Sequence, residues 1–136
     1  MRRRLWELPA FAPQQQAATD RLTVTNLRAW RLREPSSGRR YTVVRVESRG
    51  GEVGYGEGGP APASEISEAK AAVVGRRATE AEFVRQRLTA LPAMEAAIND
   101  AFLDLLGKAT NVPVYQFLGG PRRFKTRFAR ASGGQR

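Results

Sequence analysis

The strongest pattern in the chain is an apolar stripe that recurs every three or four residues from residue 93 to residue 109. This spacing predicts a helix with one buried side. Val112-Pro113 should end it, because proline disfavours helical backbone in the residue before it. A further apolar turn stops at Gly119-Gly120. We expect the rest of the chain to pack on this stripe, which consists of Ala93, Met94, Ala97, Ile98, Ala101, Phe102, Leu105, Leu106 and Ala109.

Three segments with strand-like alternation precede the helix. The first covers residues 21–33, the second residues 41–48, and the third is the short, glycine-rich run Val53-Gly-Tyr-Gly-Glu57. A tight turn at Gly50-Gly51 joins the last two, so an antiparallel meander is predicted. In the first strand the parity expected to face the core contains Leu22, Val24, Trp30 and Leu32.

Two shorter helical patterns lie between the strands and the long helix. The first has Ser64 as its expected N-cap and Gly75 as its stop, and the second begins at an expected capping box, Thr79 to Glu82. Strands followed by helices favour an α+β fold: a three-stranded antiparallel meander and then a three- to four-helix bundle. The expected core positions of the two helices are Ile66, Ala69, Val73, Phe83, Val84, Leu88 and Leu91.

The composition restricts the chemistry of this 136-residue chain, whose length fits one domain. It contains neither cysteine nor histidine. Disulfides, thiolate or imidazole metal sites and Ser-His or Cys-His dyads are therefore excluded. Asp100 and Asp104 lie one helical turn apart, and we interpret them as surface or helix-to-sheet salt bridges. Any catalysis would have to use carboxylates, lysine, arginine, tyrosine or hydroxyl groups.

The net charge of +10 is concentrated at the two ends. Residues 122–136 hold six basic residues and no acidic one, whereas residues 8–121 hold fourteen basic and twelve acidic residues. A nucleic-acid surface should lie across a folded face, so nucleic-acid binding is the weaker hypothesis. No stretch approaches the roughly 20 apolar residues of a membrane span. Residues 1–20 are expected to be a disordered lead, in which a relic of a leader peptide stays open; the cytoplasm is the default location.

Two runs of the sequence resemble a known family. Val53-Gly-Tyr-Gly-Glu57 closes the meander, and Asp-Leu-Leu-Gly-Lys-Ala at residues 104–109 leads into Pro-Val-Tyr-Gln-Phe-Leu-Gly-Gly at residues 113–120. Both runs look like the N-terminal capping domain of the enolase superfamily, in its mandelate racemase and muconate lactonizing enzyme branch. The second run is the more specific. The resemblance assigns residues 21–120 to the capping domain and residues 121–136 to a connector toward a barrel.

The resemblance implies the chemistry of a larger enzyme. In this family the cap closes over a (β/α)8 barrel whose carboxylates hold Mg²⁺, and a barrel base removes the proton α to the carboxylate of a small substrate. The parent reaction would be racemisation, epimerisation, cycloisomerisation or dehydration, with acid sugars as one substrate class, and full-length members are often homo-oligomers. Such a barrel takes about 200 residues or more, and 16 follow Gly120. We therefore expect a truncated chain that is inert by itself and holds no cofactor, Mg²⁺ being implied for the parent enzyme.

Two loops of the cap complete the substrate pocket in this family, and they map to residues 34–40 and 57–64. An arginine fork suits a carboxylate, and a closing loop excludes water. The plainer interpretations are surface solubility for the two arginines Arg39 and Arg40 and packing for Tyr55. For Glu57 the plainer interpretation is a strand-end carboxylate that accepts backbone hydrogen bonds or pairs with an arginine. The expected substrate-capping residues are Arg39, Arg40, Tyr55, Glu57 and Gly58.

Two functions outside this picture stay open. One is a stand-alone, non-catalytic binding module that docks on a separate barrel chain. The other is a small basic nucleic-acid-binding protein, whose retention on DNA or RNA would depend steeply on salt.

Overall fold

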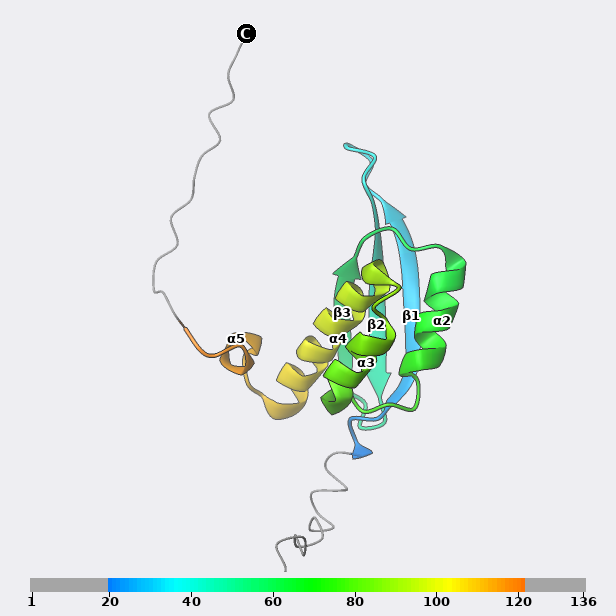
Figure 1. Ribbon diagram of the computed structural model, residues 1–136. Helices are drawn as coiled ribbons and strands as arrows, with labels where there is room; N and C mark the ends of the chain where they lie inside the picture. The colour runs from blue at the N-terminus through cyan, green and yellow to red at the C-terminus, as the bar shows by residue number, and fades with distance from the viewer. Residues whose placement is uncertain (1–19, 122–136) are drawn as a thin grey trace, which may run out of the picture.

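The computed structural model describes residues 20–121 as a three-stranded sheet with helices on one face (Figure 1). The strands β1 (Val24–Arg33), β2 (Arg40–Ser48) and β3 (Val53–Gly58) are antiparallel and lie in the order β1-β2-β3. The predicted α+β meander is therefore confirmed. The predicted lead and connector lie outside the described residues, apart from Asp20 and Pro121.

The helices follow the sheet in the chain, as the sequence pattern predicts. They are α2 (Ala63–Val73), α3 (Ala81–Arg87), which is preceded by a 3-10 turn (Ala78–Glu80), α4 (Pro92–Thr110) and the short α5 (Val114–Phe117). In Figure 1, α2, α3 and α4 cover the same face of the sheet, and α5 projects from the end of α4.

The core lies between the sheet and α4, so the central role predicted for the long helix is confirmed. Its members include Leu27, Val44 and Val46 from the sheet and Met94, Ile98, Phe102 and Leu105 from α4. The buried stripe ends at Leu105 and the half-buried Leu106, whereas Ala109 is exposed. Asn111, with φ of 54°, caps α4 just before Val112-Pro113.

The contact between β3 and α4 requires glycine on the strand. A Cβ placed on Gly54, Gly56 or Gly58 would lie 2.0, 1.9 and 1.9 Å from the carbonyl oxygens of Ala101, Ala97 and Ala93, respectively. Two residues of a strand span about 6.7 Å and four residues of a helix about 6 Å. Every second residue of the strand, a glycine, therefore meets every fourth residue of the helix, an alanine, and the two backbones approach directly.

Two side chains of α4 cover the outer edge of β3. The backbone N–H of Tyr55 donates to the carboxylate of Asp104 at 2.9 Å, and the ammonium group of Lys108 donates to the carbonyl oxygen of Val53 at 2.9 Å. Lys108 and Asp104 also pair with each other at 2.6 Å. The surface salt bridge expected of Asp104 is confirmed, within α4, and its link to the sheet is a hydrogen bond. Occupied edge groups cannot template a further strand, so this pair protects the edge of the sheet. The salt bridge expected of Asp100 does not occur among residues 20–121.

The predicted inward parity of β1 is wrong after Val24. A bulge between Val24 and Asn26 shifts the register of β1 against β2. An extra residue reverses which side chains face the core. Leu27 is therefore buried, whereas Trp30 and Leu32 are 43% and 41% exposed on the face that the helices leave bare.

The predicted starts of α2 and α3 are also wrong. Pro62 has the extended backbone of an N-cap, so α2 begins before Ser64. Before α3, the Glu80 carboxylate accepts the Arg77 backbone N–H, and the helix begins at Ala81 rather than at a Thr79 cap. With this start Val84 and Leu88 face inward and Phe83 faces solvent, 42% exposed. Its ring lies between the guanidinium groups of Arg76 and Arg87, at 4.8 and 4.9 Å from its centroid.

A carboxylate joins the β2–β3 hairpin to the segment that enters β1. Glu52 accepts a hydrogen bond from the Ser48 hydroxyl at 2.6 Å and pairs with Arg21 at 2.9 Å. The Ser48 hydrogen bond, the Glu52 backbone N–H and the Arg21 charge lower the pKa of the Glu52 carboxyl below 4.5. All three favour the charged form of Glu52, so the folded protein holds this carboxyl ionised more strongly than the unfolded chain does.

Gly56→Ala should lower the free energy of unfolding by about 1–3 kcal/mol, because the added Cβ overlaps the backbone of α4. Gly59→Ala is the matched control: its Cβ would lie 3.6 Å from that of Ala93, an ordinary contact, and a change within about 0.5 kcal/mol is expected. Urea denaturation of both variants measures the difference. Equal stability of the two variants would contradict the close approach.

Glu52→Gln should make the free energy of unfolding fall less steeply as the pH is lowered. Because the folded pKa lies below the unfolded value of 4.5, this group stabilises the fold above that pH and its contribution disappears as the pH falls toward the folded pKa. Urea denaturation at several pH values between about 6 and 3 covers this window. Glu68→Gln, at an exposed position of α2, is the control and should parallel the wild type. A Glu52→Gln curve that also runs parallel would exclude the proposed linkage.

Candidate functional site

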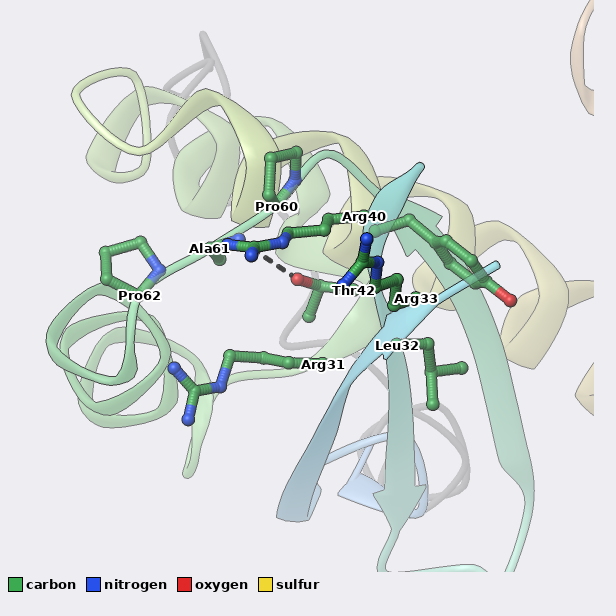
Figure 2. Close-up of a pocket in the computed structure, with 9 residues that line it drawn as sticks. Arg31, Leu32, Arg33, Arg40, Thr42, Pro60, Ala61 and Pro62 are labelled. Carbon is green, nitrogen blue, oxygen red and sulfur yellow. Dashed lines mark hydrogen bonds between the residues drawn. The ribbon is translucent and has the colours of Figure 1, made fainter. Parts of the chain in front are cut away.

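A hollow of about 560 Å³ opens at one end of the sheet, where β1 ends, β2 begins and the segment after β3 leads into α2. It borders both loops that the sequence singles out, residues 34–40 and 57–64: Arg40 lines it from the first, and Pro60, Ala61 and Pro62 line it from the second. Its lining, shown in Figure 2, consists of Arg31, Leu32, Arg33, Arg40, Tyr41, Thr42, Pro60, Ala61 and Pro62.

The side chain of Thr42 ties the two walls of the hollow together. Thr42 is fully buried on the same side of β2 as Val44 and Val46. Its hydroxyl accepts the backbone N–H of Ala61 at 3.1 Å, which is the dashed line in Figure 2. Because a buried hydroxyl needs such a partner, this bond holds the segment before α2 against the sheet. The alternation of β2 puts Thr42 on the same face as Val44 and Val46, but the sequence does not show that its hydroxyl bonds to Ala61.

Three arginines surround the opening. The bulge in β1 gives Arg31 and Arg33 the parity of Leu27, and Arg40 pairs with Arg33 in the sheet register. The strands continue past the buried core here, so these three side chains are exposed. In Figure 2, Arg31 and Arg40 extend toward the Pro60–Pro62 segment, whereas Leu32 points the other way. No acidic residue of the described chain lines the hollow.

The predicted residues Arg39 and Glu57 lie close to each other. The Arg39 guanidinium and the Glu57 carboxylate are 3.4 Å apart, with 70% and 54% of the two side chains exposed. This contact links the loop after β1 to the end of β3. An exposed pair contributes at most about 1 kcal/mol, so it can open and close at low cost.

The other predicted residues are distributed over three places. Arg40 lines the hollow. Tyr55 is 50% exposed, and its ring centroid is 5.4 Å from the Lys108 ammonium, away from the residues that line the hollow. Gly58 packs against the backbone of Ala93. Sequence reasoning did not single out Arg31 and Arg33, because the alternating pattern alone contains no sign of the bulge that sets their direction.

Residues 20–121 contain neither a metal-binding cluster nor a membrane-spanning helix. Among residues 20–121, no three acidic, histidine or cysteine side chains gather closely enough to hold a metal ion. Within the same range, no helix has the length and the apolar run that a membrane crossing takes.

Comparison with known proteins agrees with the fold. The family model of the mandelate racemase / muconate lactonizing enzyme N-terminal domain matches residues 33–119. A hydrophobic dipeptide epimerase from Enterococcus faecalis is 33% identical over 92 residues, which cover 57% of this chain and 26% of that protein. The chain thus spans about a quarter of the length of this curated relative.

Two solved structures show the same arrangement of sheet and helices. An isomerase from Streptomyces coelicolor A3(2) superposes with a TM-score of 0.67 at 30% identity, covering 75% of this chain and 32% of that one. A muconate cycloisomerase from Azorhizobium caulinodans superposes with a TM-score of 0.64 at 28% identity, covering 74% and 31%. With the family model matching well over half of its residues, the chain belongs to the mandelate racemase / muconate lactonizing enzyme family, as its N-terminal domain.

Proposed function

We propose that this chain is the capping and substrate-specificity domain of an enolase-superfamily enzyme that removes the α-proton of a small carboxylate substrate. The observation that carries the proposal is the hollow at the end of the sheet, which borders the two predicted cap loops and has arginines around its opening. The domain binds and encloses the substrate, and a barrel supplies the reacting groups. The chain by itself turns over no substrate.

The fit to Mg²⁺ is poor in the part of the chain that the structure describes, where no cluster of three acidic side chains forms. No step of this proposal therefore passes through a metal held by residues 20–121. When bound to a barrel, Mg²⁺ would stabilise the negative charge that develops on the substrate carboxylate.

In this proposal the residues of this chain bind the substrate and enclose it. Arg40 offers a planar guanidinium fork to a carboxylate at the opening of the hollow. The loop at residues 34–39 covers that opening when it closes, and exclusion of water strengthens each charged contact beneath it. The Arg39–Glu57 pair joins this loop to β3. Its release would free the loop for substrate entry.

An apolar turn at the end of the described chain supports a barrel as the partner. Tyr115, Phe117 and Leu118 on or beside α5 are 50%, 45% and 68% exposed, and no residue of α5 is buried. Adjacent exposed apolar side chains of this kind mark an interaction surface. A barrel that follows in the same polypeptide, or a separate barrel chain that binds this module, would cover them.

A cap exchange tests the proposal. In the Enterococcus faecalis hydrophobic dipeptide epimerase, the segment that aligns with this chain is replaced by residues 20–121. The chimera should turn over a carboxylate substrate with kcat/KM at least about tenfold above the same barrel without a cap, because the cap positions substrate and excludes water. The 136-residue chain alone should show no turnover. A chimera no better than the capless barrel, with circular dichroism showing both parts folded, would refute the capping role.

A further inference from the structure

We infer that the free edge of β1 binds an extended segment of another protein, in which acidic and apolar side chains alternate. The segment adds a fourth strand to the sheet, beside residues 29–33. This contact goes beyond the capping role and is independent of it. The backbone of β1 supplies the hydrogen bonds, and the side chains on its two faces select the sequence of the partner.

The hydrogen bonds of the sheet show which backbone groups of β1 face outward. The N–H of Ser48 donates to the carbonyl oxygen of Glu52 at 2.9 Å across the β2–β3 hairpin. Because neighbouring residues of a strand direct these groups to opposite sides, the even-numbered residues of β2 face β3 and the odd-numbered ones face β1. The register pairs the odd-numbered ones with Arg28, Trp30 and Leu32, whose backbone groups therefore face β2. The outward groups in the second half of β1 belong to Ala29, Arg31 and Arg33.

No hydrogen bond to the outward groups of this stretch occurs among residues 20–121. Neighbouring parts of the two sheet edges are covered. At the start of β1 the backbone of Val24 bonds to Gly75 and Arg76, and the next outward residue, Leu27, is buried. On β3, side chains of α4 occupy edge groups. The second half of β1, an outer strand in Figure 1, is therefore a stretch of edge that can template a further strand.

The side chains of this stretch that share a face with the helices are positively charged. Arg31 and Arg33 have the parity of the buried Leu27 and are themselves exposed. Neither pairs with a carboxylate among residues 20–121. Side chains of an added strand would lie directly opposite them, with Cβ atoms about 4.5–5.5 Å apart. Opposite charges at such positions are stabilising, so acidic side chains fit on this face.

The side chains of the same stretch on the other face are apolar. Trp30 and Leu32 are 43% and 41% exposed on the face that the helices leave bare, and Leu32 points away from Arg31 in Figure 2. Because the side chains of an added strand also alternate between the two faces, every second one would lie beside this pair. An apolar side chain there removes apolar surface from water. The edge thus favours a segment in which acidic and apolar residues alternate.

Charge disfavours the occupants that this protein could itself supply. Two copies paired along this edge would bring Arg31 and Arg33 of both copies onto one face, and like charges opposite each other are destabilising. Residues 1–19 hold three basic residues and one acidic residue, and residues 122–136 hold six basic residues and no acidic one. The acidic strand is therefore assigned to another protein.

Binding of a synthetic peptide to the full 136-residue chain tests the inference. The probe is acetylated Glu-Val-Glu-Val-Glu-Val-Glu, and the comparison peptide has lysine in place of every glutamate. Calorimetry at about 0.15 M salt, which screens long-range attraction, should show one saturable site for the acidic peptide. The lysine peptide should bind at least about tenfold more weakly, because it places like charges opposite the arginines.

Hydrogen exchange followed by NMR locates the peptide on the chain. At saturation the amides of Ala29 and Arg31 should exchange at least about tenfold more slowly, because they gain a partner in the added strand. The amides of Arg28 and Trp30 already face β2, and their exchange should change by less than about twofold.

Two substitutions of Arg31 separate the backbone contact from the charge. Arg31→Gln removes only the charge and should weaken peptide binding by no more than about fivefold, since an exposed ion pair contributes little. Arg31→Pro also removes the outward N–H. Because this N–H makes no bond within the described chain, the edge strand tolerates proline, and saturable binding should disappear. Circular dichroism checks the fold of both variants. Arg87→Gln on α3 is the control and should change the affinity by less than about twofold.

Several outcomes would overturn the inference. The first is the absence of saturable binding, or binding that leaves the exchange of the Ala29 and Arg31 amides unchanged, and this readout holds even if Arg31→Pro fails to fold. Equal affinity for the lysine peptide, or a loss in Arg87→Gln as large as in Arg31→Gln, would show non-specific binding. Protection of the same amides without peptide would assign the edge to a second copy if dilution removes it, and to a segment of this chain if it persists.

Discussion

The direct backbone contact between β3 and α4 is the constraint on which the domain depends. Gly54, Gly56 and Gly58 have no Cβ, so α4 lies against the strand with its alanine carbonyls where side chains would otherwise stand. Interiors are close-packed and transmit small displacements. One methyl group on that strand would therefore lift the long helix away from the sheet and open the core beneath Phe102 and Leu105. The glycines of this strand thus serve packing.

The same contact sets where the domain is open. Because α4 and α2 cover the sheet only along its packed length, the last residues of β1 and the first of β2 continue past the buried core (Figure 1). Residues there lie on the same face of the sheet as the core residues, but they are exposed because no helix covers them. At Arg31, Arg33 and Arg40 the side chains are charged, and the hollow beside the loops results. The sheet thus carries the three arginines, and the loop between β1 and β2 lies beside them.

Charge is arranged differently in the body of the domain and at the hollow. In the body, carboxylates such as Glu52, Glu80 and Asp104 pair with nearby arginine or lysine side chains. Some also accept hydrogen bonds from backbone N–H groups at the ends and edges of the secondary structure, which would otherwise lack a partner. At the hollow, positive charge is left without a carboxylate in the described chain. The first arrangement stabilises the fold, and the second is the basis of the proposed contact with a substrate carboxylate.

The sequence by itself determined the order and type of the elements, the long helix as the centre of the core, the family resemblance and the two loops, because periodicity and local motifs are properties of neighbouring residues. Only the tertiary structure decided which face of β1 is buried, since the bulge after Val24 depends on pairing with β2. It also turned Phe83 outward through the start of α3, and it brought Arg31 and Arg33 beside Arg40. Each of these depends on contacts between segments that are distant in the chain, which no local pattern records.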